Sequence, residues 1–180
     1  MGTASKALMC EHEAILSVLD VLEQIYQGMQ TGRKTAVQDI TDILEFLKIF
    51  ADKCHHGKEE SFLFPALEKI GVKNEGGPIG VMLSEHKEGR ELIRQMQESA
   101  GDNTFDKPAF VYASTSYVML LRNHIRKENM ILFPLGDSAF SADVQEKLLN
   151  EFEIIDKAVI GEIRQKEFNS MIGRLREKYL

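Results

Sequence analysis

One pattern occurs twice in this chain and constrains its fold more than any other feature. The sequence reads HHGKEESFLFP from His55 and HIRKENMILFP from His124, so both copies follow H-x-x-x-E-x-x-x-L-F-P. Aligning the two copies also pairs Glu59 with Glu128. In a helix, residues four apart lie one turn above each other on the same face. Each copy therefore predicts an imidazole and a carboxylate that point in the same direction.

A further histidine precedes each copy of the pattern. His12 lies upstream of the first copy and His86 lies upstream of the second, so the order His, then His-x-x-x-Glu, occurs twice. Of the 5 histidines in the chain, only His56 falls outside this order. Two similar helical hairpins, each carrying two histidines and one glutamate, predict a two-metal centre inside a helical bundle.

Length and composition limit the class of protein. A chain of 180 residues can bury a substantial core within one domain. Its net charge of −6 argues against a nucleic acid or an acidic membrane as partner. No apolar run approaches the roughly 20 residues that span a bilayer, and the N-terminus lacks the apolar stretch of a signal peptide. We therefore expect a cytoplasmic protein that binds neither nucleic acid nor membranes.

The two cysteines, Cys10 and Cys54, are too few for a disulfide framework, which fits a reducing compartment. Both lie close in sequence to histidines of the pattern. Adjacent helical residues point about 100° apart, so we do not expect these thiols to share a metal ion with the neighbouring histidines. We expect inert thiols, with a redox or ligand role as the alternative.

Glycine, proline and polar clusters divide the chain into amphipathic helical segments, and no stretch shows the alternation of a half-buried strand. The segments predicted to be helical are residues 6–29, 35–65, 79–99 and 108–135, a fifth capped by Ser141, and a terminal piece over 168–180. Pro65 is expected to kink or end the second helix, and a turn is expected at Gly136 and Asp137. Gly89 is expected to leave room for a bulky neighbour.

The two glutamates carry most of the argument for a metal. They lie on the same stripes as Leu, Ile and Phe, and an ionised carboxylate taken out of water is costly unless it meets a cation or strong donors. Those stripes carry no consistent Lys or Arg, so metal ions are the simplest compensation. Two alternatives stay open: His–Glu hydrogen-bonded pairs in a polar core layer, or a Glu59 and Glu128 that reach solvent at the end of the bundle.

The donor types narrow the choice of metal. Nitrogen and oxygen donors without thiolates suit Fe, Mn, Zn, Ni or Cu rather than the hard cations that prefer oxygen alone. Structural zinc is usually held in a closed site of four ligands. Six ligands in two matched sets therefore fit two carboxylate-bridged metals better.

These motifs resemble the hemerythrin-like family, specifically its HHE cation-binding domain. The resemblance rests on the repeated H…HxxxE pattern with Leu-Phe-Pro after each copy and on the segment GGPIGVMLSEH that ends at His86, and it covers roughly residues 5–135. It implies an up-and-down four-helix bundle around a non-haem di-iron centre. The expected fold is thus all-α, with the bundle in residues 1–138 and an additional C-terminal helix packing on it in residues 139–180.

The resemblance also implies which residues bind the metal. One iron would be held by His12 and His55, the other by His86 and His124, and both would be bridged by Glu59, Glu128 and an oxo or hydroxo group. Other transition metals stay open. Oxygen-carrying hemerythrins have an extra histidine one turn from the position of His86, where this chain has Met82 and Arg90. Oxygen carriage by a deliberately asymmetric pair is therefore not expected.

Two further residues are candidates near the metals. His56 is a candidate extra ligand or hydrogen-bonding neighbour of a ligand, with a surface role as the alternative. Tyr117 is a candidate hydrogen-bonding neighbour or oxidisable ligand, with an aromatic core position as the alternative. We expect the ligand pocket to be lined by Phe62, Met82, Leu121 and Ile131.

The resemblance implies a protein that binds or processes a small oxidant: dioxygen, peroxide or nitric oxide. Catalase-like or peroxidase-like turnover is left open. The alternative is a sensor or adaptor in which metal occupancy or oxidation state acts through the C-terminal helix. A homodimer is also left open.

Overall fold

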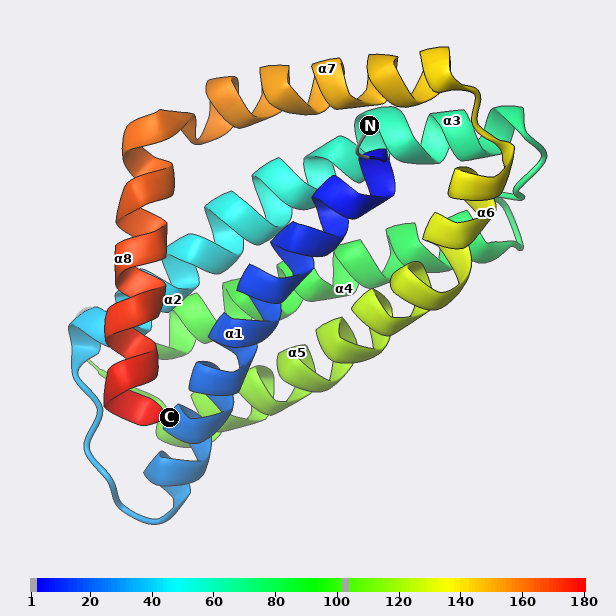
Figure 1. Ribbon diagram of the computed structural model, residues 1–180. Coiled ribbons are helices and arrows are strands. Elements are labelled where there is room, and N and C mark those ends of the chain that lie inside the picture. Colours follow the sequence, from blue (N-terminus) through cyan, green and yellow to red (C-terminus); the bar gives the residue numbers. More distant parts are fainter. Residues whose placement is uncertain (1–2, 102–103) are drawn as a thin grey trace.

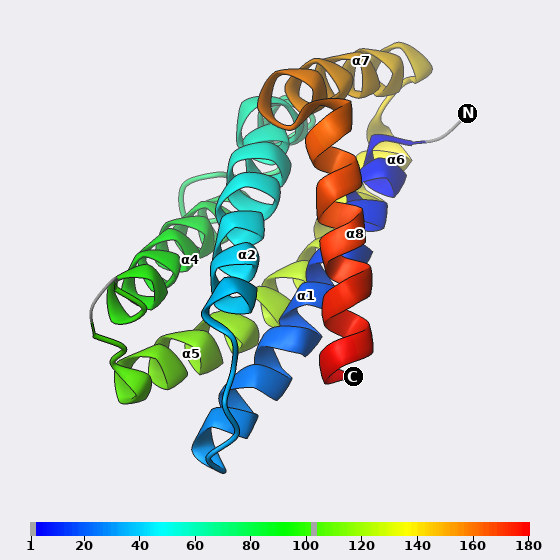
Figure 2. The same ribbon diagram turned by 90° about the vertical axis from the view of Figure 1, so that its left-hand side faces the viewer.

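The computed structural model describes residues 3–101 and 104–180, and these residues form helices joined by loops, with no strand among them. The chain makes an up-and-down bundle of helical rods (Figures 1 and 2), in which the η segments are π-helical. Along the chain these rods are α1 (Ala4–Gln30); α2 (Val37–Phe46) with η1 (Leu47–His56), η2 (Glu59–Leu63) and α3 (Phe64–Lys69); α4 (Pro78–Ser99); and α5 (Lys107–Lys127) with η3 (Glu128–Leu132) and α6 (Phe133–Ala139). The expected all-α bundle is confirmed.

The second and fourth rods continue past the prolines of the repeated motif, so of the kink or helix end expected at Pro65, the helix end is wrong. In each rod a π turn starts at the motif glutamate, and the residue before the proline donates its backbone N–H to that glutamate's carbonyl: Phe64 to Glu59, and Phe133 to Glu128. A π turn is wider than an α turn and gives the proline ring the room that it lacks in an α-helix. The rods consequently stay helical well beyond the motif.

The C-terminal part contains two helices, α7 (Ala142–Val159) and α8 (Gly161–Tyr179), so the terminal piece predicted over 168–180 belongs to a separate helix that begins earlier, at Gly161. Ser141 caps α7 as predicted, because its side chain accepts the N–H of Val144. The turn expected at Gly136 is wrong, since α6 runs through that residue to Ala139. Gly161 makes the corner between the two helices with a φ of +68°, a conformation that favours glycine. The division of the chain at residue 138 stays a prediction.

The two C-terminal helices cover one side of the bundle. In Figure 1, α7 crosses above η1 and η2, and α8 turns down over α1 and α2. Both helices contact α1, and α7 also contacts η1 and η2. Figure 2 shows α8 lying against the first two rods, away from α4 and α5. The side of the bundle formed by α1 and the second rod is therefore covered by the C-terminal helices.

A layer of histidines and glutamates separates two apolar cores. One core begins at Ile15 in α1 and includes Phe46, Ala51 and Leu121. The other includes Leu8 in α1 and residues of the repeated Leu-Phe-Pro segments. On the first three rods the predicted ligand residues fall between the members of these two cores. On the fourth rod Glu128 does so, whereas His124 lies next to Ile125 of the first core. The polar layer is thus closed off by apolar packing above and below.

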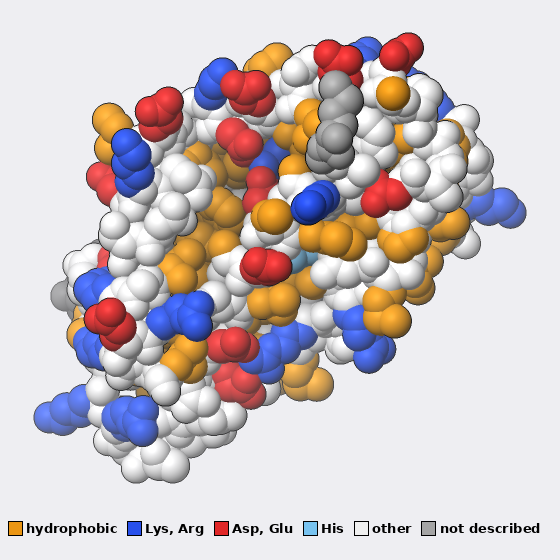
Figure 3. Space-filling view, viewed as in Figure 1, with side chains coloured by type: hydrophobic (Ala, Val, Ile, Leu, Met, Phe, Trp, Pro, Cys, Tyr) orange, Lys and Arg blue, Asp and Glu red, His pale blue; other side chains and the backbone are white. Residues whose placement is uncertain are grey.

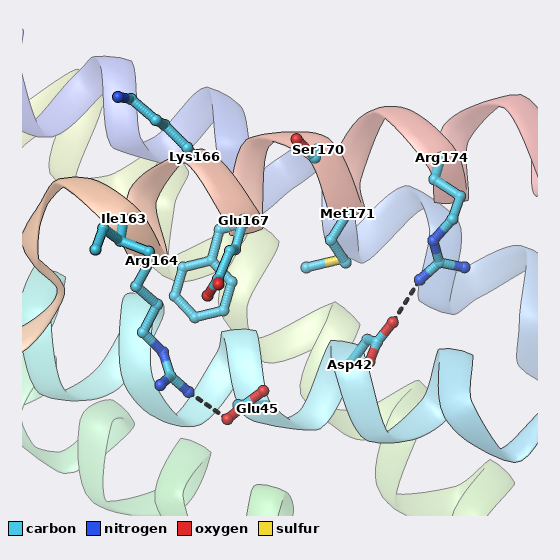
Figure 4. A pocket seen from close by; sticks show the side chains of 10 residues that line it. Asp42, Glu45, Ile163, Arg164, Lys166, Glu167, Ser170, Met171 and Arg174 are labelled. Atoms are coloured by element: carbon cyan, nitrogen blue, oxygen red, sulfur yellow. Dashed lines mark hydrogen bonds and ion pairs between the residues drawn. The ribbon is translucent and has the colours of Figure 1, made fainter.

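Buried Asp39 anchors the end of α8. Its carboxylate accepts hydrogen bonds from the hydroxyl of Tyr179 at 2.6 Å, from Arg174 at 2.7 Å and from Lys178 at 2.5 Å. Arg174 also pairs with Asp42, and this contact joins α8 to α2 along the groove shown in Figure 4. Burial raises the pKa of Asp39, but the three donors outweigh it and lower this pKa to about 2.

Replacing Asp39 with Asn is expected to destabilise the metal-free protein by about 1–3 kcal/mol at pH 7, because three donors lose their charged acceptor. A carboxyl whose pKa is lowered by folding stabilises the fold above its unfolded pKa, near the ordinary 3.8, and this stabilisation fades as the pH falls towards 2. Urea unfolding at pH 7 and pH 3 measures the difference. An Asp39→Asn effect that is equally large at pH 3, or smaller than that of Asp42→Asn at pH 7, contradicts this account.

Candidate metal centre

All six predicted ligands are buried and lie together in the polar layer. Two groups of side chains have ligand atoms within 4.8 Å of one another, and both could hold a metal ion: His12, His55, Glu59 and Glu128 form one, and His56, Glu59, His86 and His124 form the other. Glu59 belongs to both groups. Almost no histidine surface is visible on the face shown in Figure 3. A dinuclear arrangement sharing a carboxylate is therefore geometrically available.

The two glutamates face histidines on both sides of the layer. One oxygen of Glu59 lies 3.4 Å from Nε2 of His55, and its other oxygen lies 3.4 Å from Nε2 of His86. Oε2 of Glu128 lies 3.3 Å from Nε2 of both His12 and His124. Both glutamates are fully buried, which excludes the alternative in which they reach solvent.

Each of the four histidines is held through its outer ring nitrogen. The Nδ1 atoms lie 2.7–3.0 Å from an oxygen on a neighbouring helix, in the pairs His12–Asn129, His55–Glu11, His86–Glu60 and His124–Glu85. A carboxylate can only accept, so in the last three pairs Nδ1 carries the proton. The Nε2 lone pair of a neutral imidazole then points into the layer, as in the histidine ligands of metalloproteins.

The contacts inside the layer call for a cation. Nε2 of His12 lies 2.9 Å from Nε2 of His55, and the corresponding distance between His86 and His124 is 3.1 Å. Two such nitrogens with lone pairs facing each other repel unless a proton or a metal ion lies between them. Nitrogens bound at about 2.1 Å to one metal, roughly at right angles, lie about 3 Å apart. The observed spacing fits this arrangement.

The carboxylate oxygens of Glu59 and Glu128 lack hydrogen-bond donors among the described residues. Within the described residues, none of the four carboxylate oxygens of Glu59 and Glu128 makes a hydrogen bond of good geometry. Buried, unpartnered carboxylates are costly, whereas binding to a cation would satisfy them. The donor set therefore fits a pair of metal ions better than the alternative of hydrogen-bonded His–Glu pairs.

The pKa shifts of the residues in the layer also indicate that it favours a cation. Burial lowers the pKa of His86, but Glu59 and Glu60 outweigh it and raise this pKa to about 9. Burial likewise lowers the pKa of His12, and the net shift is upward because of Glu128. Burial raises the pKa of Glu59, but the neighbouring imidazoles, with His55 foremost, hold it well below its usual range. The layer thus favours positive charge.

His56, left over from the repeat, is part of the second group. Its ring stacks on His86 with the centroids 3.9 Å apart, and the part of the chain that the structure describes offers neither ring nitrogen a hydrogen bond. Burial lowers its pKa well below the ordinary value, and the charges of His86 and His124 lower it further. A neutral imidazole with a free lone pair beside other ligands is suited to metal binding. The surface role considered for His56 is wrong.

Tyr117 lies outside both groups. Its side chain is fully buried in the core below the polar layer, and burial raises the pKa of its hydroxyl. It is also the bulky neighbour expected at Gly89, although a Cβ there would lie 3.6 Å from its ring, an ordinary contact. Among the four expected pocket residues, Met82 and Leu121 are buried, but Ile131 is 52% exposed and that prediction is wrong.

Sequence reasoning missed the residues that orient the histidines. Glu11 and Glu85 immediately precede His12 and His86, and lysines stand at matching places in both repeats, which read H-x-x-K-E. Lys58 is a buried cation, which the sequence analysis did not expect, but it pairs with Glu11 and Asp156 rather than with the glutamates of the layer. The lysines lie inside the aligned repeats and Glu11 and Glu85 lie next to the upstream histidines, whereas Asp156 lies outside both.

The Leu-Phe-Pro segments shield the layer. Phe64, from the first repeat, stacks on His86 at 5.7 Å, and Phe133, from the second, stacks on His12 at 5.4 Å. Each phenylalanine therefore covers a histidine from the other hairpin. This crossed arrangement explains why the motif follows both His-x-x-x-Glu segments.

The cysteines take no part in either group. Cys54 is buried, and burial raises the pKa of its thiol well above the ordinary value, as expected for an inert thiol. Cys10 is exposed. In the described part of the chain, no helix combines the length and apolar character needed to cross a membrane.

Comparison with known proteins finds one matching family model and several relatives of similar sequence. A sequence model described as the hemerythrin HHE cation binding domain matches residues 3–136. An uncharacterized protein of Mycobacterium tuberculosis is 23% identical over 164 residues, which cover 89% of this chain and 64% of that protein. The iron-sulfur cluster repair protein YtfE of Edwardsiella ictaluri is 31% identical over 134 residues, covering 70% of this chain and 60% of that protein.

The protein of the same name in Escherichia coli is 34% identical over 86 residues, 44% of this chain and 39% of that protein. The chain thus spans 64% or less of the length of these relatives. No solved structure matches it.

Proposed function

The chain belongs to the hemerythrin HHE cation-binding family, and from this premise we propose that it holds two iron ions and binds or processes a small oxidant: dioxygen, peroxide or nitric oxide. The observation that carries the proposal is the sharing of Glu59 by two groups of metal-ligating side chains inside one buried layer. A single-metal protein has no need of two such groups.

The proposed ligands divide into two sides. The first side is His12 and His55, and the second is His86 and His124, with His56 as an additional ligand on the second side. Glu59 and Glu128 would bridge the two sides, since each lies against histidines of both. When bound, the iron ions would supply redox chemistry and Lewis acidity toward the oxidant.

The chain's own contribution is orientation and exclusion of water. The carboxylates of Glu11, Glu60 and Glu85 hold Nδ1–H groups and so fix the ring planes. Phe64 and Phe133 cover two of the rings. A buried layer closed in this way admits a small diatomic molecule or a peroxide more readily than a larger substrate.

The test is anaerobic reconstitution of the metal-free protein with iron(II), followed by separate additions of dioxygen, hydrogen peroxide and nitric oxide. We expect about two ions per chain and an optical spectrum that changes with at least one of the three. Steady evolution of dioxygen from peroxide would mark catalase-like turnover. Two bound ions without a spectral response to any of the three would refute the oxidant proposal while leaving the metal centre intact.

Replacing His56 with Phe is expected to weaken the binding of one of the two ions by about 10–100-fold and to leave the other unchanged. The reason is that His56 groups only with residues of the second side and Glu59. Iron titration by calorimetry measures both affinities. Tyr117→Phe is the matched control, since Tyr117 lies outside both groups; equal behaviour of the two variants would exclude His56 as a ligand.

Two other functions have some support. The name of the Edwardsiella and Escherichia relatives makes repair of iron–sulfur clusters a candidate, which reactivation of a cluster-damaged dehydratase by the iron-loaded protein would test. A sensor acting through the C-terminal helices is supported by the ion pair between Lys58 and Asp156 of α7. The homodimer and the cytoplasmic location stay predictions.

A further inference from the structure

On the first side of the metal centre, the ligand His55 is connected to a buried ion pair. Glu11 accepts a hydrogen bond from Nδ1 of His55 at 2.8 Å through one oxygen and pairs with Lys58 through the other. The side chain of Lys58 is only 1% exposed. A buried ammonium is stable only when carboxylates compensate it fully. The position of Glu11 thus depends on how Lys58 is held.

The second side of the metal centre contains the same arrangement of histidine, glutamate and lysine, with one difference. Glu85 accepts from Nδ1 of His124 at 3.0 Å and pairs with Lys127, which stands at the place of Lys58 in the repeat. The Lys127 side chain, however, is 32% exposed, and its only ion pair within the described chain is with Glu85. Water can compensate this lysine, so the second half needs no further partner.

Lys58 has a second carboxylate, and it comes from the C-terminal extension. Asp156 on α7 accepts from the ammonium of Lys58 at 2.7 Å and from the thiol of Cys54 at 3.1 Å. Phe152, one turn earlier on α7, lies over the same ammonium at 5.8 Å. These contacts join α7 to the metal layer through the chain of residues Asp156, Lys58, Glu11 and His55.

Asp156 also changes the charge that Glu11 presents to His55. Because the ammonium is shared between two carboxylates, Glu11 is less fully neutralised and is a stronger acceptor for the Nδ1–H group. A stronger acceptor at Nδ1 makes the opposite nitrogen of an imidazole a better metal ligand. The Glu85 branch lacks such a contribution in the described residues.

We propose that Asp156 is a positioning residue for His55, so that the C-terminal extension controls one side of the metal centre and leaves the other side independent. The proposal rests on the proposed two-metal function. It adds that α7 affects the ion held by His12 and His55 and not the ion held by His86 and His124.

The surface around Asp156 makes the residue accessible to experiment. A hollow of about 500 Å³, bounded by α1, α7 and α8 and visible in Figure 3, is lined by Glu11, Glu153 and Asp156 among others. Asp156 is 48% exposed, so replacing it with the isosteric Asn is not expected to disturb packing. Glu153, one turn earlier on α7, pairs only with Lys157 within the described chain and provides a matched control.

The test measures loss of iron(II) from the fully loaded, full-length protein to a chromogenic chelator in excess, without any assay of activity. In Asp156→Asn, half of the iron is expected to leave about 3–10-fold faster than in the unmodified chain, and the other half at an unchanged rate. This factor lies below the 10–100-fold typical of a direct neighbour of a ligand, because Asp156 acts one step further away. Glu153→Gln should match the unmodified chain.

Two further variants assign the effect. Glu85→Gln should accelerate release of the other half of the iron, because it weakens the acceptor for Nδ1 of His124. Asp156→Glu should restore slow release because it returns the carboxylate. Unchanged release in Asp156→Asn, or equal acceleration of both halves, would overturn the proposal. If the unmodified chain binds no iron, the proposed function fails first and this inference falls with it; two bound ions insensitive to Asp156 refute the inference alone.

Discussion

Replacing Glu59 with Gln is expected to remove both metal ions from the protein. Glu59 is the one residue that both ligand groups contain, and its two oxygens face histidines on opposite sides of the layer. The substitution keeps the size of the side chain and removes the charge that compensates two cations. Loss of an orienting neighbour already costs about 10–100-fold in metal affinity, so loss of a shared charged ligand should exceed about 100-fold.

The measurement is metal content after reconstitution with iron(II) and gel filtration. Glu60→Gln is the matched control, because Glu60 is adjacent in sequence and contacts the outer nitrogen of His86 and the guanidinium of Arg90, not an inward-facing nitrogen of the layer. We expect this control to lose about 10–100-fold in affinity, as for other orienting neighbours, and to retain more iron than Glu59→Gln, which should retain almost none. Two ions per chain in Glu59→Gln, with affinity close to that of the unmodified protein, would show that Glu59 is no ligand.

Removing the metal is expected to lower the thermal stability strongly. A ligand present at about 1,000 times its dissociation constant stabilises the folded state by about 4 kcal/mol. For a chain of this size, each kcal/mol corresponds to about 2–4 °C in melting temperature. Chelation should therefore lower the melting temperature by about 8–16 °C for each tightly bound ion that it removes.

In a double variant that lacks both glutamates, removing the metal is not expected to lower the melting temperature. In the metal-free protein, Glu59 and Glu128 are buried without hydrogen bonds of good geometry in the described structure. Replacing both with Gln removes two buried charges, so at pH 10, where His86 is mostly neutral and no longer compensates them, the metal-free double variant should melt no lower than the metal-free unmodified protein. Added iron should not raise its melting temperature. A double variant that is much less stable without metal would mean that the glutamates have a structural role independent of cations.

The sequence was sufficient to predict the residues that the structure brings together. Residues four apart on a helix share a face whatever the rest of the fold, so His55 with Glu59 and His124 with Glu128 followed from spacing alone. The upstream His12 and His86 followed from the duplication. Because the same spacing occurs in both copies of the repeat, the second copy supported the ligand positions predicted from the first.

The orienting contacts could not be predicted in the same way, because they join different helices. Glu11 reaches His55, and Glu60 reaches His86, across interfaces whose register depends on the packing of the whole bundle. Asp156 has no counterpart in the repeat and is brought to Lys58 only by the fold of α7 onto the bundle. The error at Pro65 has a local cause, since the π turn that accommodates it has no simple sequence signal.

X-ray absorption spectroscopy of the iron-loaded protein tests the central claim most directly. The account predicts imidazole scattering around each iron together with a second iron at about 3.5–4 Å, the separation typical of paired metal sites. It also predicts that the metal–metal contribution disappears in Glu59→Gln. Iron surrounded by imidazole and oxygen, but with no metal neighbour in the fully loaded protein, would contradict a dinuclear centre built around the shared glutamate.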